Sequence, residues 1–156
     1  MKVWVRAYNG QGFGSGFIKR FTFGDFSHVS LVFEICETYE EIESIQGKGV
    51  IRHRPYSHKD KDFVEFQVPL TEEQVFTAHI EACTLVGASY DYKGIWGFMV
   101  RKDRHSKDRF FCSEFVAYVL LKCGYPLSRR EPYRETPTSI AETLRIFAPV
   151  EESGGA

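Results

Sequence analysis

The sequence predicts a single α+β domain, with helices packed against one antiparallel sheet. Alternating apolar and polar residues recur through the first half of the chain, as is typical of strands. The pattern changes to helical spacing after a Thr-Glu-Glu-Gln capping box at residues 71–74. Strands that precede helices favour separate layers over alternating β-α units. A chain of 156 residues suits one core, so we assign residues 1–150 to one domain and 151–156 to a disordered tail.

Short connections between the expected strands favour an antiparallel meander. The strands are expected at residues 2–8, 27–35, 39–45, 49–54 and 63–68. The clearest is 27–35, because Val29, Leu31 and Phe33 alternate with His28 and Ser30. Helices are expected at residues 17–23, 71–88, 112–123 and 137–147. The glycine-rich segment 10–16 lacks both the phosphate-binding-loop and the dinucleotide pattern, so we interpret it as a turn.

Composition excludes several classes of partner. A net charge of −1 gives no reason to expect nucleic acid or an anionic membrane. No segment approaches the roughly 18 apolar residues of a membrane span, so no integral membrane segment is expected. The N-terminal residues lack a secretory signal, which favours a cytoplasmic location, with export by another route left open.

The cysteine spacing predicts no metal centre. The chain has no Cys-x-x-Cys pair among its four cysteines, Cys36, Cys83, Cys112 and Cys123. We therefore expect no cofactor and no metal, and free thiols in a reducing compartment.

Cys112 lies where a charged loop becomes an amphipathic helix. The unpaired N–H groups and the positive end of the helix dipole favour a thiolate there, which is the nucleophilic form. The competing interpretation is a small buried hydrophobic residue. Cys112 precedes the apolar stripe of its helix rather than lying within it, which favours the nucleophile.

A nucleophilic thiol needs a base, and His28 is the best-placed histidine because a strand holds its side chain with little slack. Its competing role is a hydrogen bond to a core carbonyl. Exposed roles are expected for His53 and His58, and a half-buried helical position for His79. His105 lies in a loop, which is a poor place to fix an imidazole.

A third group should orient the imidazole. Glu41 and Glu43 share one face of the next strand by alternation, and we prefer Glu43 because apolar residues bracket it. A carboxylate on a solvated sheet face is the competing interpretation. Glu34 lies roughly 20 Å from His28 along an extended strand, which is too far for contact.

The motifs Ser27-His28-Val29, Tyr90-Asp91-Tyr92 and Phe111-Cys112-Ser113-Glu114 resemble those of the permuted papain-like amidases. This family, of the YiiX/YaeF type, belongs to the NlpC-like cysteine peptidase superfamily. The resemblance spans about residues 12–124. It rests on the order of the motifs, since the histidine strand precedes the cysteine helix.

The resemblance implies a circularly permuted, papain-like fold with Cys112 as nucleophile and His28 as general base. The orienting group falls at or near Glu43, and the Cys112 N–H would meet the oxyanion. Tyr92 and Ser27 are implied as substrate-binding residues, with core packing as the alternative for Tyr92. The chain departs from the family in having Glu114 where a small residue is common, and in lacking a signal peptide.

We therefore expect a cysteine hydrolase, an amidase or peptidase, that cleaves an amide bond through an acyl-enzyme. By analogy alone, the substrate class is a cell-wall peptide or another small-molecule, peptide or lipid amide. The alternatives are a lipid acyltransferase or phospholipase of the lecithin retinol acyltransferase type, and a non-catalytic phage or prophage accessory binding module. The oligomeric state is left open.

Overall fold

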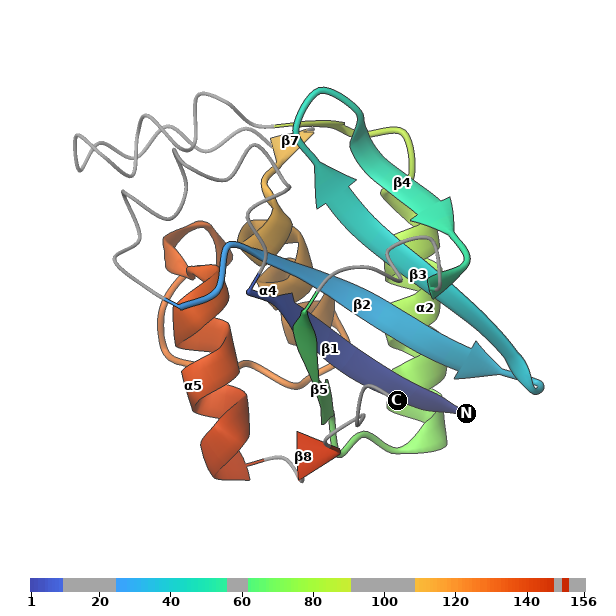
Figure 1. The fold of residues 1–156 in the computed structure, drawn as a ribbon. Helices are drawn as coiled ribbons and strands as arrows, with labels where there is room; N and C mark the ends of the chain where they lie inside the picture. Colours follow the sequence, from blue (N-terminus) through green and yellow to red (C-terminus); the bar gives the residue numbers. More distant parts are fainter. Residues whose placement is uncertain (10–24, 56–61, 91–108, 148–149, 152–156) are drawn as a thin grey trace.

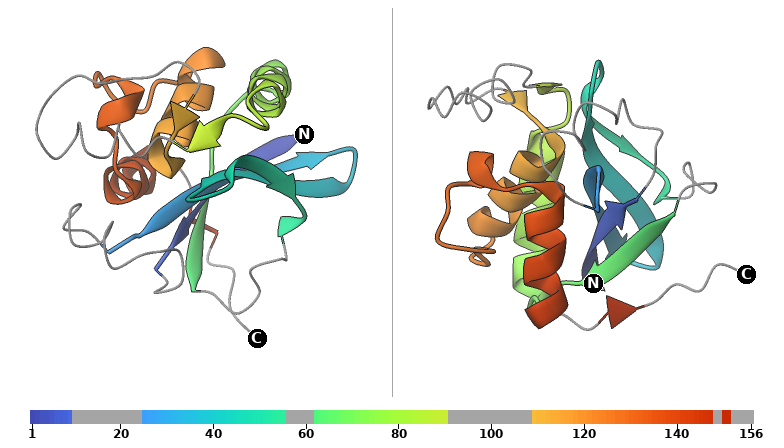
Figure 2. Two further views of the ribbon diagram at one scale, coloured as in Figure 1. Left: turned by 90° about the horizontal axis from the view of Figure 1, so that it is seen from above. Right: turned by 60° about the vertical axis from the view of Figure 1, so that its left-hand side comes forward.

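A computed structural model describes residues 1–9, 25–55, 62–90, 109–147 and 150–151 of the chain. It confirms the α+β class: helices lie on one side of an antiparallel sheet (Figures 1 and 2). The predicted helix at 17–23, the glycine-rich segment 10–16 and most of the predicted tail lie outside the described residues. Glu151, which we assigned to that tail, instead pairs with Glu65.

The main sheet has the strand order β4-β3-β2-β1-β5-β8, and all neighbouring pairs in it are antiparallel. The strands are β1 (Lys2–Tyr8), β2 (His28–Ile35), β3 (Thr38–Ile45), β4 (Gly49–His53), β5 (Phe63–Gln67) and β8 (Val150–Glu151). Two short strands, β6 (Ser89–Tyr90) and β7 (Arg109–Phe110), form a separate parallel pair.

The predicted meander is correct for β1 to β4 and wrong for β5, which pairs with β1. The edge of β4 that does not pair with β3 is hydrogen-bonded to the segment after helix α2. The Val50 N–H donates to the Ala88 carbonyl at 2.8 Å, and the Gly87 N–H donates to the Val50 carbonyl at 2.9 Å. These bonds occupy the edge at which a fifth meander strand would begin to pair.

The helices are α2 (Glu72–Thr84), α4 (Cys112–Lys122) and α5 (Pro137–Phe147), with a 3₁₀ turn η2 (Pro132–Arg134). The predicted capping box is present, with the Thr71 hydroxyl accepting from the Gln74 N–H. Helix α2 ends earlier than predicted, and Gly87 follows with a φ of +94°, which a helix cannot include. Helix α4 begins at Cys112, as predicted.

The core lies between the sheet and the helices. Leu31 and Phe33 of β2 and Ile42 of β3 are fully buried in one cluster with Phe115 and Leu120 of α4. The opposite face of β1, β2 and β3 carries polar residues that are also buried; they are Arg6, His28, Ser30, Glu41 and Glu43. Buried polar groups need partners, and these groups form the networks described next.

Candidate active site

The structure brings together the three residues that the sequence selected for catalysis. His28 is the first residue of β2, Glu43 lies in β3, and Cys112 is the first residue of α4. His28 Nε2 bonds Glu43 Oε2, and the ring also hydrogen-bonds the Cys112 side chain. The three residues are 3%, 0% and 2% exposed, so their interactions are little weakened by solvent.

Polar contacts fix the start of α4 relative to the sheet. The Ser44 hydroxyl of β3 donates to the Phe110 carbonyl at 2.6 Å, two residues before Cys112. The Ser113 hydroxyl donates to the Glu135 carbonyl at 2.7 Å, which ties the other side of Cys112 to the turn before α5. The backbone on both sides of the thiol is therefore anchored.

The electrostatics of the site favour an imidazolium at His28. Burial alone would lower the pKa of His28, because it disfavours the charged ring. Cys112 and then Glu43 oppose this by charge and hydrogen bonding, and together they raise the pKa of His28 to about 10. An imidazolium so stabilised is the partner that a thiolate at Cys112 requires.

Glu43 also binds a second histidine, which sequence reasoning missed. His53 of β4 contacts Glu43 Oε1 through Nε2 at 2.5 Å, and its Nδ1 lies 3.0 Å from the Arg54 carbonyl oxygen. Both ring nitrogens face acceptors, an arrangement in which the imidazolium form donates to both. Consistently, its pKa is raised: burial lowers it, but the hydrogen bond and charge of Glu43 outweigh that effect.

The expected exposed role of His53 is therefore wrong. Its side chain is 18% exposed, and it lies in the polar network because the register pairs it with Glu41. Strand alternation could have placed it on the face of Glu43, but only if the pairing of β3 with β4 had been known.

Glu41, the alternative orienting residue, is engaged elsewhere. Its Oε1 accepts from the Tyr8 and Ser30 hydroxyls, both at 2.5 Å, and its Oε2 lies 3.2 Å from Arg6 Nη1. Arg6 also pairs with Glu65 at 2.7 Å. Glu41 thus belongs to a buried ion-pair network that joins β1, β2, β3 and β5.

Of the two implied substrate-binding residues, the structure describes Ser27 but not Tyr92. Ser27 is buried, and its N–H and hydroxyl both donate to the Tyr8 carbonyl, at 2.9 and 3.3 Å. Those bonds fix the entry to β2 and place His28 beside the Tyr8 ring, with centroids 5.5 Å apart. Tyr92 lies outside the described residues, as do His58 and His105.

Fold and site together define an α+β protein with a buried cysteine–histidine–glutamate arrangement. Neither the family models nor the curated proteins that were searched include a match to this chain. Among the described residues, no helix has both the length and the apolar character needed to cross a membrane.

Proposed function

We propose that this protein is a cysteine hydrolase of the permuted papain-like amidase type. The observation that supports this best is the double contact of His28, with the Cys112 thiol and with the Glu43 carboxylate. A nucleophile, a base and an orienting group at hydrogen-bonding distance are what acyl transfer through a thiol requires. The order of the elements, histidine strand, glutamate strand and cysteine helix, is also that of the permuted branch.

In the proposed reaction, the Cys112 thiolate attacks the carbonyl carbon of an amide, and a carbon–sulfur bond forms. His28, held as an imidazolium, gives its proton to the leaving nitrogen as the carbon–nitrogen bond breaks. The neutral ring then takes a proton from water, whose oxygen attacks the thioester. Hydrolysis releases the carboxylic acid and restores the thiolate–imidazolium pair.

The ring nitrogens divide these tasks. Nε2 is bonded to Glu43, so we assign the proton transfers to Nδ1. The negative charge on the carbonyl oxygen develops at the N-terminus of α4, where the Cys112 N–H can donate to it and the helix dipole favours an anion.

The substrate class rests on the resemblance alone, and a cell-wall peptide amide is the proposed choice. Incubation with peptidoglycan fragments should release free amino groups. Hydrolysis or transfer of acyl chains from lipids, with no peptide cleavage, would instead support the acyltransferase or phospholipase alternative. Failure of Cys112 to form an adduct with any acyl donor would support the non-catalytic binding module.

Thiol reactivity gives a test that needs no substrate. We expect iodoacetamide to alkylate Cys112 faster than the other thiols at about pH 6, because the His28 imidazolium, with its pKa raised to about 10, favours a thiolate beside it. An ordinary thiol, with a pKa of about 8.5, loses about tenfold in reactivity per pH unit below that value. Mass spectrometry of peptides after timed labelling would measure each cysteine separately.

In the labelling experiment, the exposure of a thiol and its ionisation predict different orders of reaction. Cys36 is exposed and Cys112 is buried, so accessibility alone predicts that Cys36 reacts first at every pH. The Cys112→Ala variant reports the background from the remaining three thiols. Labelling of Cys112 that is no faster than theirs at pH 6 would refute its role as nucleophile.

A further inference from the structure

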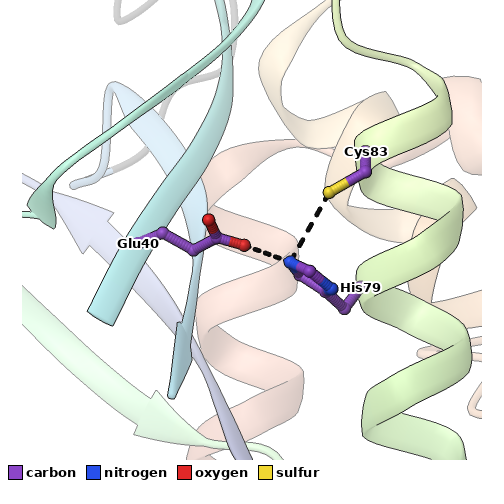
Figure 3. Close-up of side chains that lie close together, drawn as sticks. All are labelled: Glu40, His79 and Cys83. Carbon is purple, nitrogen blue, oxygen red and sulfur yellow. Dashed lines mark hydrogen bonds and ion pairs between the residues drawn. The ribbon is translucent and has the colours of Figure 1, made fainter. Parts of the chain in front are cut away.

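A second cluster of chemically active side chains lies between β3 and α2, apart from the candidate active site. Glu40 of β3 faces His79 and Cys83 of α2 (Figure 3). Glu40 Oε1 bonds His79 Nε2, and Cys83 Sγ lies 3.5 Å from that same nitrogen. The three donor atoms all lie within 4.8 Å of one another. The spacing of four residues puts both helix residues on one face of α2.

The geometry does not suit a second catalytic arrangement. A histidine that passes a proton between a thiol and a carboxylate uses a different ring nitrogen for each. Here both groups converge on Nε2, as the dashed lines in Figure 3 show. The single Nε2 atom therefore cannot relay a proton between these two partners. A cation at the point of convergence would satisfy all three.

We propose that Glu40, His79 and Cys83 bind a zinc ion. Thiolate, imidazole and carboxylate are the three protein ligands that zinc takes, and three such ligands leave a fourth position for water. The thiolate and carboxylate together balance the charge of the ion. The His79 and Glu40 side chains are 19% and 11% exposed, so an ion can enter from solvent.

Neighbouring groups hold two of the proposed ligands in place. The Arg52 guanidinium bonds Glu40 Oε2, with Nε at 2.5 Å, and this directs Oε1 toward His79. The Phe33 ring meets the His79 ring edge-on, with centroids 5.2 Å apart. Outer contacts of this kind orient the ligands of a metal and strengthen its binding.

The proposed site reverses the expectation of no metal that the cysteine spacing gave. Zinc motifs read from spacing need ligands close together in the sequence. Here Glu40 is 39 residues from His79 in the sequence. The two residues meet only because α2 packs over β3 in the folded chain. The ion would link the helix to the sheet, so it should stabilise the fold whether or not the protein is a hydrolase.

Cobalt substitution tests the site directly, because a thiolate bound to Co²⁺ gives an intense near-ultraviolet charge-transfer band. We expect the chelator-treated protein to develop this band with one equivalent of Co²⁺, and Zn²⁺ to abolish it. Cys83→Ser should lose the band. Cys112→Ser should keep it, which separates this cluster from the candidate active site. Zinc at 100-fold excess over its Kd should raise the Tm by about 5–10 °C.

Absence of the band in the wild-type protein would overturn the proposal without any variant. A band that persists in Cys83→Ser and disappears in Cys112→Ser would also overturn it and would assign the metal to the candidate active site. Should Cys83→Ser fail to fold, His79→Gln and Glu40→Gln provide the same comparison through the zinc-dependent Tm shift. A shift equal to that of the wild type in both variants would count against the site.

Discussion

The Cys112→Ala variant should lose amide hydrolysis by a factor on the order of 10⁵, because it lacks the proposed nucleophile that forms the acyl-enzyme. The loss should appear in kcat and should leave substrate binding largely intact. Removing one small buried side chain should change the free energy of unfolding by only about 1–2 kcal/mol. Release of amino groups from peptidoglycan fragments, measured beside a thermal melt, separates the two effects.

Cys123 provides a matched control at the other end of the same helix. It is also buried, and its thiol donates to the Leu120 carbonyl at 3.1 Å. Cys123→Ala removes the same atom from the same core. It should leave kcat within about twofold, because Cys123 lies at the opposite end of α4 from Cys112. Equal losses in the two variants would show that activity follows core packing, and the nucleophile assignment would fail.

Local patterns predicted the elements that depend on neighbouring residues. Strand alternation and the capping box fix β2 and the start of α2 from a few adjacent side chains, and both match the structure. The position of Cys112 at a helix start is local in the same sense. These features need no knowledge of how distant segments pair.

Pairing between strands is what the sequence could not supply. Glu41 and Glu43 share a face by alternation, and only the register of β2 with β3 decides which of them meets His28. The same holds for His53, whose contact with Glu43 depends on the β3–β4 register. The place of β5 beside β1, and the approach of Glu40 to His79, are likewise set by long-range packing.

Glutamine substitutions at Glu43 and Glu41 should separate catalysis from stability. Both carboxylates are fully buried on the same face of β3, and each change keeps the shape of the side chain. Glu43→Gln replaces the acceptor that binds His28 Nε2 with a neutral amide. The thiolate–imidazolium pair then loses a supporting charge, and we expect kcat to fall on the order of 10²–10⁴-fold.

Glu41→Gln should act on the fold instead. It leaves the Arg6 guanidinium without one of its two carboxylate partners, while Glu65 still binds it at 2.7 Å. Breaking a buried ion pair costs about 3–5 kcal/mol, and the remaining partner favours a loss of about 3 kcal/mol. Urea unfolding measures this cost, and kcat of the folded fraction should stay within a few-fold of the wild type.

The decisive quantity is the ratio of the two effects in each variant. If Glu43 orients the imidazole, its substitution lowers kcat far more than stability, and the alkaline limb of the kcat/KM pH profile moves to a lower pH. This shift follows because Glu43 contributes to the raised pKa of His28, so without it the imidazolium that protonates the leaving nitrogen is lost at a lower pH. A Glu43→Gln variant that keeps the wild-type kcat and the wild-type kcat/KM pH profile would remove Glu43 from the mechanism and leave His28 and Cys112 as a pair.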